Sequence, residues 1–195
     1  MTTRWYRPIW CSNTVADPYV SNSGDLGSFE EWQLREGREV SGWPDNAWIK
    51  ADPRADGDPD DVLQTHLAVP IYSARLRDAL VNAGISGIQY LRVKVLRVSG
   101  VELPGFEIAN IINRIAALDL DRSSYSTYAS DYFRPERRGE ISGLRKPILR
   151  GRALDGVDIF RLQEYSVAEF VSEKFVLAFR SAGCTGYSFR EVQTV

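Results

Sequence analysis

The fold is decided by the stretch Ile71-Tyr72-Ser73-Ala74-Arg75-Leu76-Arg77-Asp78-Ala79-Leu80-Val81-Asn82-Ala83-Gly84-Ile85-Ser86-Gly87-Ile88-Gln89-Tyr90. A second stretch follows the same pattern 99 positions later: Phe170-Val171-Ser172-Glu173-Lys174-Phe175-Val176-Leu177-Ala178-Phe179-Arg180-Ser181-Ala182-Gly183-Cys184-Thr185-Gly186-Tyr187-Ser188-Phe189. One serine, two alanines and two glycines coincide between them. An internal echo of this kind is typical of a structural unit that occurs twice.

Each stretch specifies both ends of one helix. A serine stands where it can cap the first free amides, and about ten residues later a glycine can take the left-handed conformation that ends the helix. Apolar residues at i, i+3, i+4 and i+7 in between require one buried face. After a second glycine the sequence becomes strand-like. We therefore predict an internally repeated helix-turn-strand unit, over residues 71–95 and 170–192, with structural turns at Gly84, Gly87, Gly183 and Gly186.

The length and composition fit one globular domain. The chain has 195 residues, of which 44% are hydrophobic and 26% charged. A chain of this length buries roughly 70% of its unfolded surface in a single core. The net charge of -2 gives no field that favours nucleic acid or an anionic membrane. We predict a single α+β domain over residues 1–195, with a mixed sheet packed by few helices.

Shorter patterns predict the remaining elements. The isoleucines between Phe106 and Leu118 fit a helix or a strand, and periodicity leaves both open. Turn formers and prolines predict loops, and alternating apolar residues predict strands. The predicted elements are an early strand over 4–10, a loop over 17–27, a short helix over 28–34 capped by Ser28, an exposed loop over 50–61, a strand over 63–69, and two strands around a turn over 146–162.

The sequence shows no targeting or membrane-spanning pattern. Its start lacks the apolar run of a secretory signal, and no later run approaches about 18 apolar residues, so we expect a cytoplasmic protein. Cys11 and Cys184 lie far apart and in no metal-type spacing. We expect them to be two buried thiols rather than a disulfide or part of a zinc site, and we expect no cofactor.

The sequence also lacks a recognisable catalytic constellation. His66 is the only histidine, and neither cysteine has a base close to it in the sequence. Nucleophile-elbow, phosphate-loop and dinucleotide-binding motifs are absent. The aspartates before Val62 superficially resemble a calcium loop, but Asp61 stands where glycine is needed and Leu67 where glutamate should close the site. We therefore expect a protein that is not an enzyme.

Four short segments carry a resemblance to a known family. They are Val69-Pro70-Ile71-Tyr72-Ser73 through Gly87, Ala117-Leu118-Asp119-Leu120-Asp121-Arg122-Ser123, Ile159-Phe160-Arg161-Leu162, and Phe170-Val171-Ser172-Glu173 through Gly186. In this order they resemble the eleventh immunity-protein family of bacterial polymorphic toxin systems, over roughly the C-terminal two thirds, residues 62–195. Residues 1–61 form a variable N-terminal part. The resemblance implies a cytoplasmic antidote that binds and neutralises a cognate toxin, and it favours a strand over residues 106–118.

Two charged stretches are candidate partner surfaces. Asp56, Asp58, Asp60 and Asp61, in the predicted exposed loop, would present carboxylates to the basic groove of a nuclease-type toxin. A basic stretch from Arg134 to Arg152 would suit nucleic acid, but we favour a solvated loop and strand edge for it. Two other interpretations stay open beside toxin neutralisation: a small-molecule or nucleic-acid binding module, and a hydrolase built from carboxylates.

Overall fold

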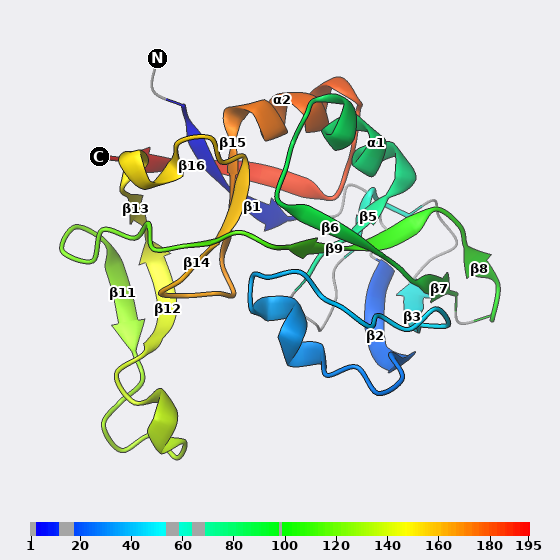
Figure 1. Cartoon of the computed structure of the whole chain (residues 1–195), viewed down its shortest axis with the longest axis horizontal. Helices are drawn as coiled ribbons and strands as arrows, with labels where there is room; N and C mark the ends of the chain where they lie inside the picture. The colour runs from blue at the N-terminus through cyan, green and yellow to red at the C-terminus, as the bar shows by residue number, and fades with distance from the viewer. Residues whose placement is uncertain (1–2, 12–17, 54–58, 64–68, 98) are drawn as a thin grey trace.

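A computed structural model describes residues 3–11, 18–53, 59–63, 69–97 and 99–195 (Figure 1). In these residues two α-helices, α1 (Ala74–Asn82) and α2 (Glu173–Ser181), accompany many strands in mixed sheets. This arrangement confirms the predicted α+β fold with few helices. The described part of the chain contains no helix that is both long and apolar enough to cross a membrane.

The described strands form four sheets. Among their pairings only β10 with β14, β13 with β16 and β3 with β7 are parallel. The six-stranded sheet has the order β10 (Arg114–Ile115), β14 (Ile159–Leu162), β15 (Glu169–Ser172), β1 (Trp5–Trp10), β16 (Tyr187–Thr194), β13 (Ile148–Leu149). One four-stranded sheet has the order β4 (Val62–Leu63), β5 (Ile71–Ser73), β9 (Phe106–Ile111), β6 (Ile88–Arg92). The other has the order β2 (Pro18–Asp25), β3 (Trp48–Pro53), β7 (Lys94–Leu96), β8 (Glu102–Leu103). The last sheet pairs β11 (Ser124–Thr127) with β12 (Ile141–Lys146), and the short 3-10 helices are η1 (Glu31–Arg35), η2 (Pro135–Arg137) and η3 (Gly151–Leu154).

The two helices begin at their serines as the sequence indicates. The Ser73 hydroxyl accepts a hydrogen bond from the amide of Leu76, and the Ser172 hydroxyl accepts one from the amide of Phe175. Each cap satisfies an amide that the first helical turn leaves free. Whether the two segments are copies of one duplicated unit stays a prediction.

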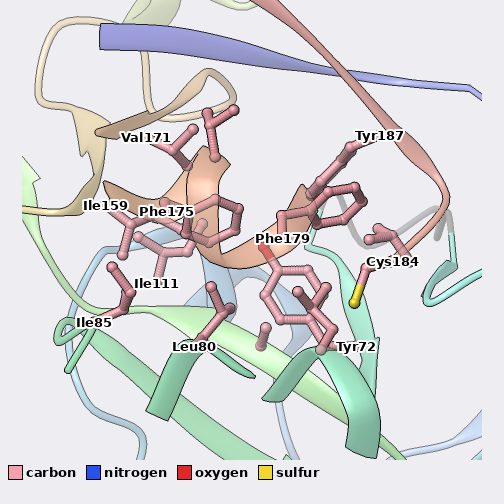
Figure 2. Packing of buried hydrophobic residues seen from close by; sticks show 14 residues of the cluster. Tyr72, Leu80, Ile85, Ile111, Ile159, Val171, Phe175, Phe179, Cys184 and Tyr187 are labelled. Carbon is pink, nitrogen blue, oxygen red and sulfur yellow. The ribbon is translucent and has the colours of Figure 1, made fainter. Parts of the chain in front are cut away.

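Both helices bury the predicted face in one shared cluster. Leu76 and Leu80 of α1 are fully buried, as is Phe175 of α2, and Phe179 is 3% exposed. Figure 2 shows Phe175 and Phe179 packed among side chains of both segments, including Leu80. Burying a large apolar side chain stabilises a fold by roughly 1.5–3 kcal/mol. This cluster therefore fixes α1 beside α2, as Figure 1 shows.

Several other predictions are confirmed. The early strand is β1, and the apolar pieces over 146–162 form the separate strands β13 and β14. Residues 106–118, which periodicity left open, contain the strands β9 and β10. In β9 the isoleucines at 108 and 111 are both fully buried. A strand buried on both faces does not alternate, which explains why periodicity could not assign it.

The predicted loop over 17–27 is wrong. Residues 18–25 of it form β2, whose backbone pairs with β3, and a register shift between Val20 and Gly24 accommodates the turn formers, while Asp17 lies outside the described residues. Such bulges let a strand continue through residues that disfavour one. The predicted exposed loop over 50–61 is wrong at both ends, because β3 runs to Pro53 while Asp60 and Asp61 are buried.

The short helix near Ser28 needs a correction too. It forms as η1, but it begins at Glu31 and no side chain caps it. Phe29 instead closes a turn onto Leu26 and packs its ring against Trp43, with the ring centroids 5.0 Å apart. That packing keeps Ser28 ahead of the helix. The predicted strand over 63–69 overlaps β4 only at Leu63, and residues 64–68, including His66, lie outside the described residues.

Candidate functional site

The four aspartates proposed as a partner-binding loop are not one exposed surface. Asp56 and Asp58 lie outside the described residues. Asp60 is 3% exposed and Asp61 is 4% exposed. Neither of these two carboxylates faces a partner that approaches from solvent.

Asp61 instead joins the two helical segments. Its Oδ1 accepts hydrogen bonds from the Ser73 hydroxyl at 2.6 Å and from Arg75 Nε at 3.0 Å. Its Oδ2 accepts the amide of Thr185 at 2.8 Å, from the turn after α2. Burial raises the pKa of Asp61, but the hydrogen bonds from Arg75, Ser73 and Thr185 together lower it by more than burial raises it. The pKa of Asp61 therefore lies below its usual value. The ionised carboxylate is thus an anchor of the fold.

Asp158 makes corresponding contacts in the second segment. Its Oδ1 accepts the Ser172 hydroxyl at 2.9 Å, and its Oδ2 accepts Lys174 Nζ at 3.0 Å. Lys174 also donates to the carbonyl of Gly84, in the turn after α1, at 2.9 Å. Each turn is therefore tied to the other segment, which holds the two helices in one rigid arrangement.

The four predicted turn glycines all have positive φ. The values are +66° for Gly84, +92° for Gly87, +63° for Gly183 and +100° for Gly186. A Cβ at Gly183 would meet nothing within 4 Å, and one at Gly84 would meet only Lys174 Nζ at 3.8 Å, whereas a Cβ at Gly87 would clash with the Asn113 side-chain amide. A Cβ at Gly186 would come within 2.8 Å of the carbonyl oxygen of Val62. The second glycine of each segment therefore has less room for a side chain than the first.

A separate feature of the structure is the β11–β12 hairpin, residues 124–146, which we call the arm. Figure 1 shows it projecting from the rest of the molecule, with η2 near its tip. Its base is attached to the core, since Ile141 and Leu144 belong to the buried cluster around Phe160 and Phe170. Arg7 Nη1 also donates to the Leu144 carbonyl at 3.2 Å. An isolated two-stranded hairpin is at best marginally stable, so this attachment is what orders the arm.

The tip of the arm is organised by aromatic rings and guanidinium groups. The rings of Tyr128 and Tyr132 lie 4.4 Å apart, and those of Tyr132 and Phe133 lie 4.5 Å apart. Arg137 stacks over Tyr128 at 4.5 Å, and Arg134 lies over Phe133 at 5.5 Å. Phe133 is nevertheless 74% exposed. The tip therefore presents a large apolar ring in a fixed cationic setting.

A groove runs along the arm where it meets the β14–β15 loop. Its volume is about 420 Å³, and we call it the arm groove. Leu120, Tyr125 and Val167, which are among the exposed large apolar residues of the chain, all line it. Arg137 and Glu140, joined at 3.3 Å, close it at the arm end. The arm groove thus shares Tyr125, Arg137 and Glu140 with the arm, and its apolar residues adjoin both basic and acidic ones.

A buried polar cluster lies elsewhere, on β14, β15 and β16. Arg161 is fully buried opposite Glu169 in the β14–β15 register, and Tyr187 donates its hydroxyl to Glu169 at 2.8 Å. Burial raises the pKa of Glu169, partly offset by the charge of Arg161. Arg161 also donates to the Ser166 carbonyl at 2.8 Å. The cluster holds the β14–β15 loop, which forms one wall of the arm groove.

The cysteines are both free thiols, as expected. Cys184 is buried and burial raises its pKa to about 11, whereas Cys11 is only half-buried, so the prediction of a buried thiol is wrong for Cys11. At such a pKa Cys184 is a thiol at neutral pH, which makes it a poor nucleophile. Within the described residues no three metal-binding side chains come together.

Fold and surface together describe a small α+β protein with a rigid body and an exposed apolar and cationic arm. The family model for the immunity protein family (Imm11) matches residues 9–194, and the chain belongs to this family. The match includes most of the N-terminal segment that the sequence resemblance had left out. No curated protein matches the chain.

Proposed function

We propose that the protein binds a cognate toxin and neutralises it through a non-catalytic protein–protein interaction. The family match over residues 9–194 is the observation that carries this proposal. The arm supports it, because exposed aromatic and arginine side chains held in place are typical of protein interfaces. The proposal includes a cytoplasmic location, where fractionation of producing cells should find the protein.

The test is a titration of the cognate toxin with the purified protein. Binding predicts a stoichiometric complex that survives gel filtration, and inhibition that is complete at a fixed molar ratio. An enzyme that destroyed the toxin or its product would act at a small fraction of that ratio. Full toxin activity in an excess of the folded protein would contradict the proposal.

A further inference from the structure

We propose that the arm and the arm groove contact the toxin, and that the contacted face of the toxin is acidic around an apolar site that receives Phe133. This inference rests on the proposed function and specifies the chemistry of the partner. It reverses the sign of charge expected from the acidic stretch, since Asp60 and Asp61 are buried within the fold.

The charges of the arm favour an acidic partner. Residues 124–146 contain five basic and three acidic residues, in a chain whose net charge is -2. Arg134 and Arg138 are exposed, and neither pairs with a carboxylate in the described part of the chain. Complementary charges across an interface speed association and select the partner. These two arginines would meet carboxylates on the toxin.

The apolar residues favour a protein over a nucleic acid. Among the large apolar residues whose exposure the structure describes, Phe133 is the most exposed, at 74%, and Leu120 and Val167 are each 46% exposed at the arm groove. Asp131, Glu136 and Glu140 lie within the same arm and would repel a phosphate backbone. A protein surface can place its carboxylates opposite the arginines and its apolar groups opposite Phe133. The regularly repeated phosphates of a nucleic acid would also approach the carboxylates of the arm.

The arm is already ordered for binding. Arg138 Nε donates to the Tyr132 carbonyl at 2.9 Å, and the amide of Gly139 donates to the Tyr128 carbonyl at 3.1 Å. These bonds and the ring stacks fix the loop that carries Phe133. A fixed loop loses little conformational entropy on binding, which makes each contact more effective. Phe133 is therefore the expected hot spot.

The experiment measures toxin binding by three forms of the protein. The arm variant carries Arg134→Glu and Arg138→Glu, and a second variant carries Phe133→Ala. The control carries Arg152→Glu and Arg190→Glu, which make the same charge change at two exposed positions outside the arm and the arm groove. Thermal melting confirms that each variant is folded.

The expected result is a Kd that rises about 100-fold in the arm variant and about 30-fold with Phe133→Ala. Association of the wild type should slow as salt increases, and the arm variant should lose this dependence. The control should bind like the wild type. Unchanged binding by both arm variants would overturn the inference while leaving the proposed function intact.

Two further outcomes would also be decisive. If the wild type itself fails to bind the toxin, the proposed function and this inference both fail. If the wild type binds mixed-sequence oligonucleotides at physiological salt and the arm variant loses only that binding, the arm is a nucleic-acid surface, and the inference is overturned.

Discussion

Basic side chains have different surroundings in two regions of the molecule: the arm, and the part around α1 and α2, which we call the body. In the body, Arg75 and Lys174 bind the two aspartates that also accept hydrogen bonds from the capping serines of the helices. In the arm, Arg134 and Arg138 are exposed, and within the described residues they have no carboxylate partner. Charges satisfied within the chain specify a fold, and charges left for solvent are available to a partner. Substitutions in the body should therefore change stability, and substitutions in the arm should change binding.

The largest expected effect is at Asp61. Asp61→Ala should lower the free energy of unfolding by about 3 kcal/mol, because it leaves the part-buried donors of Ser73, Arg75 and Thr185 without their acceptor. Asp158→Ala should cost less, about 2 kcal/mol, because it leaves the buried Ser172 hydroxyl without its acceptor, whereas the half-exposed Lys174 finds water instead. Urea denaturation measures both. Equal losses would show that the two aspartates are equivalent.

The next prediction compares the losses of stability caused by substituting the two glycines of the turn after α2. Gly183→Ala should cost about 1 kcal/mol, the penalty of a left-handed residue with free space around it. Gly186→Ala should cost about 3 kcal/mol, because its new methyl group would also press on the backbone of Val62. Thermal denaturation of the two variants gives the order. A larger loss at Gly183 would contradict the packing of the two segments.

Acid should weaken the body through Asp61. Its pKa is lowered in the folded state, so the ionised group contributes stability above the unfolded value of about 3.9. That contribution is lost as the pH falls through the lower folded pKa. Asp61→Asn should therefore be less stable than the wild type at neutral pH, with a gap that narrows below about pH 4. A gap that stays constant from neutral pH to acid would exclude this role.

The smallest effect on stability is expected in the arm. Phe133→Ala, and the pair Arg134→Glu with Arg138→Glu, should change the free energy of unfolding by less than about 1 kcal/mol, because the contacts that they remove lie within the exposed tip of the arm. Urea denaturation beside the Asp61 variants provides the comparison. A loss as large as that of Asp61→Ala would mean that the arm is part of the core.

Local signals in the sequence predicted the helices but not the acids that hold them. Ser73, Ser172 and the glycines lie within one helix length of what they cap, so a single segment reveals them. Asp61 lies 12 residues before Ser73, whereas Asp158 lies 14 residues before Ser172. Because these separations differ, the two aspartates do not coincide when the sequence is compared with itself at an offset of 99. An aspartate directly before an apolar pair, as in Asp61-Val62-Leu63 and Asp158-Ile159-Phe160, was the available signal.

The exposure of the acidic stretch was predicted wrongly for a related reason, since Asp60 and Asp61 are buried. Composition alone made the aspartates near residue 60 look solvated, but burial depends on partners far away in the chain, such as Thr185. The basic stretch was correctly identified as exposed. The arm groove beside it could not be predicted, because its wall at residues 163–167 joins the arm only in the folded chain.

Growth rescue in cells that express the toxin tests the central claim most directly. Cells that carry the wild type or the Arg152→Glu and Arg190→Glu control should grow, and cells that carry the Arg134→Glu and Arg138→Glu arm variant at the same level should not. Equal rescue by all three proteins would contradict the claim that this protein neutralises its toxin through the arm.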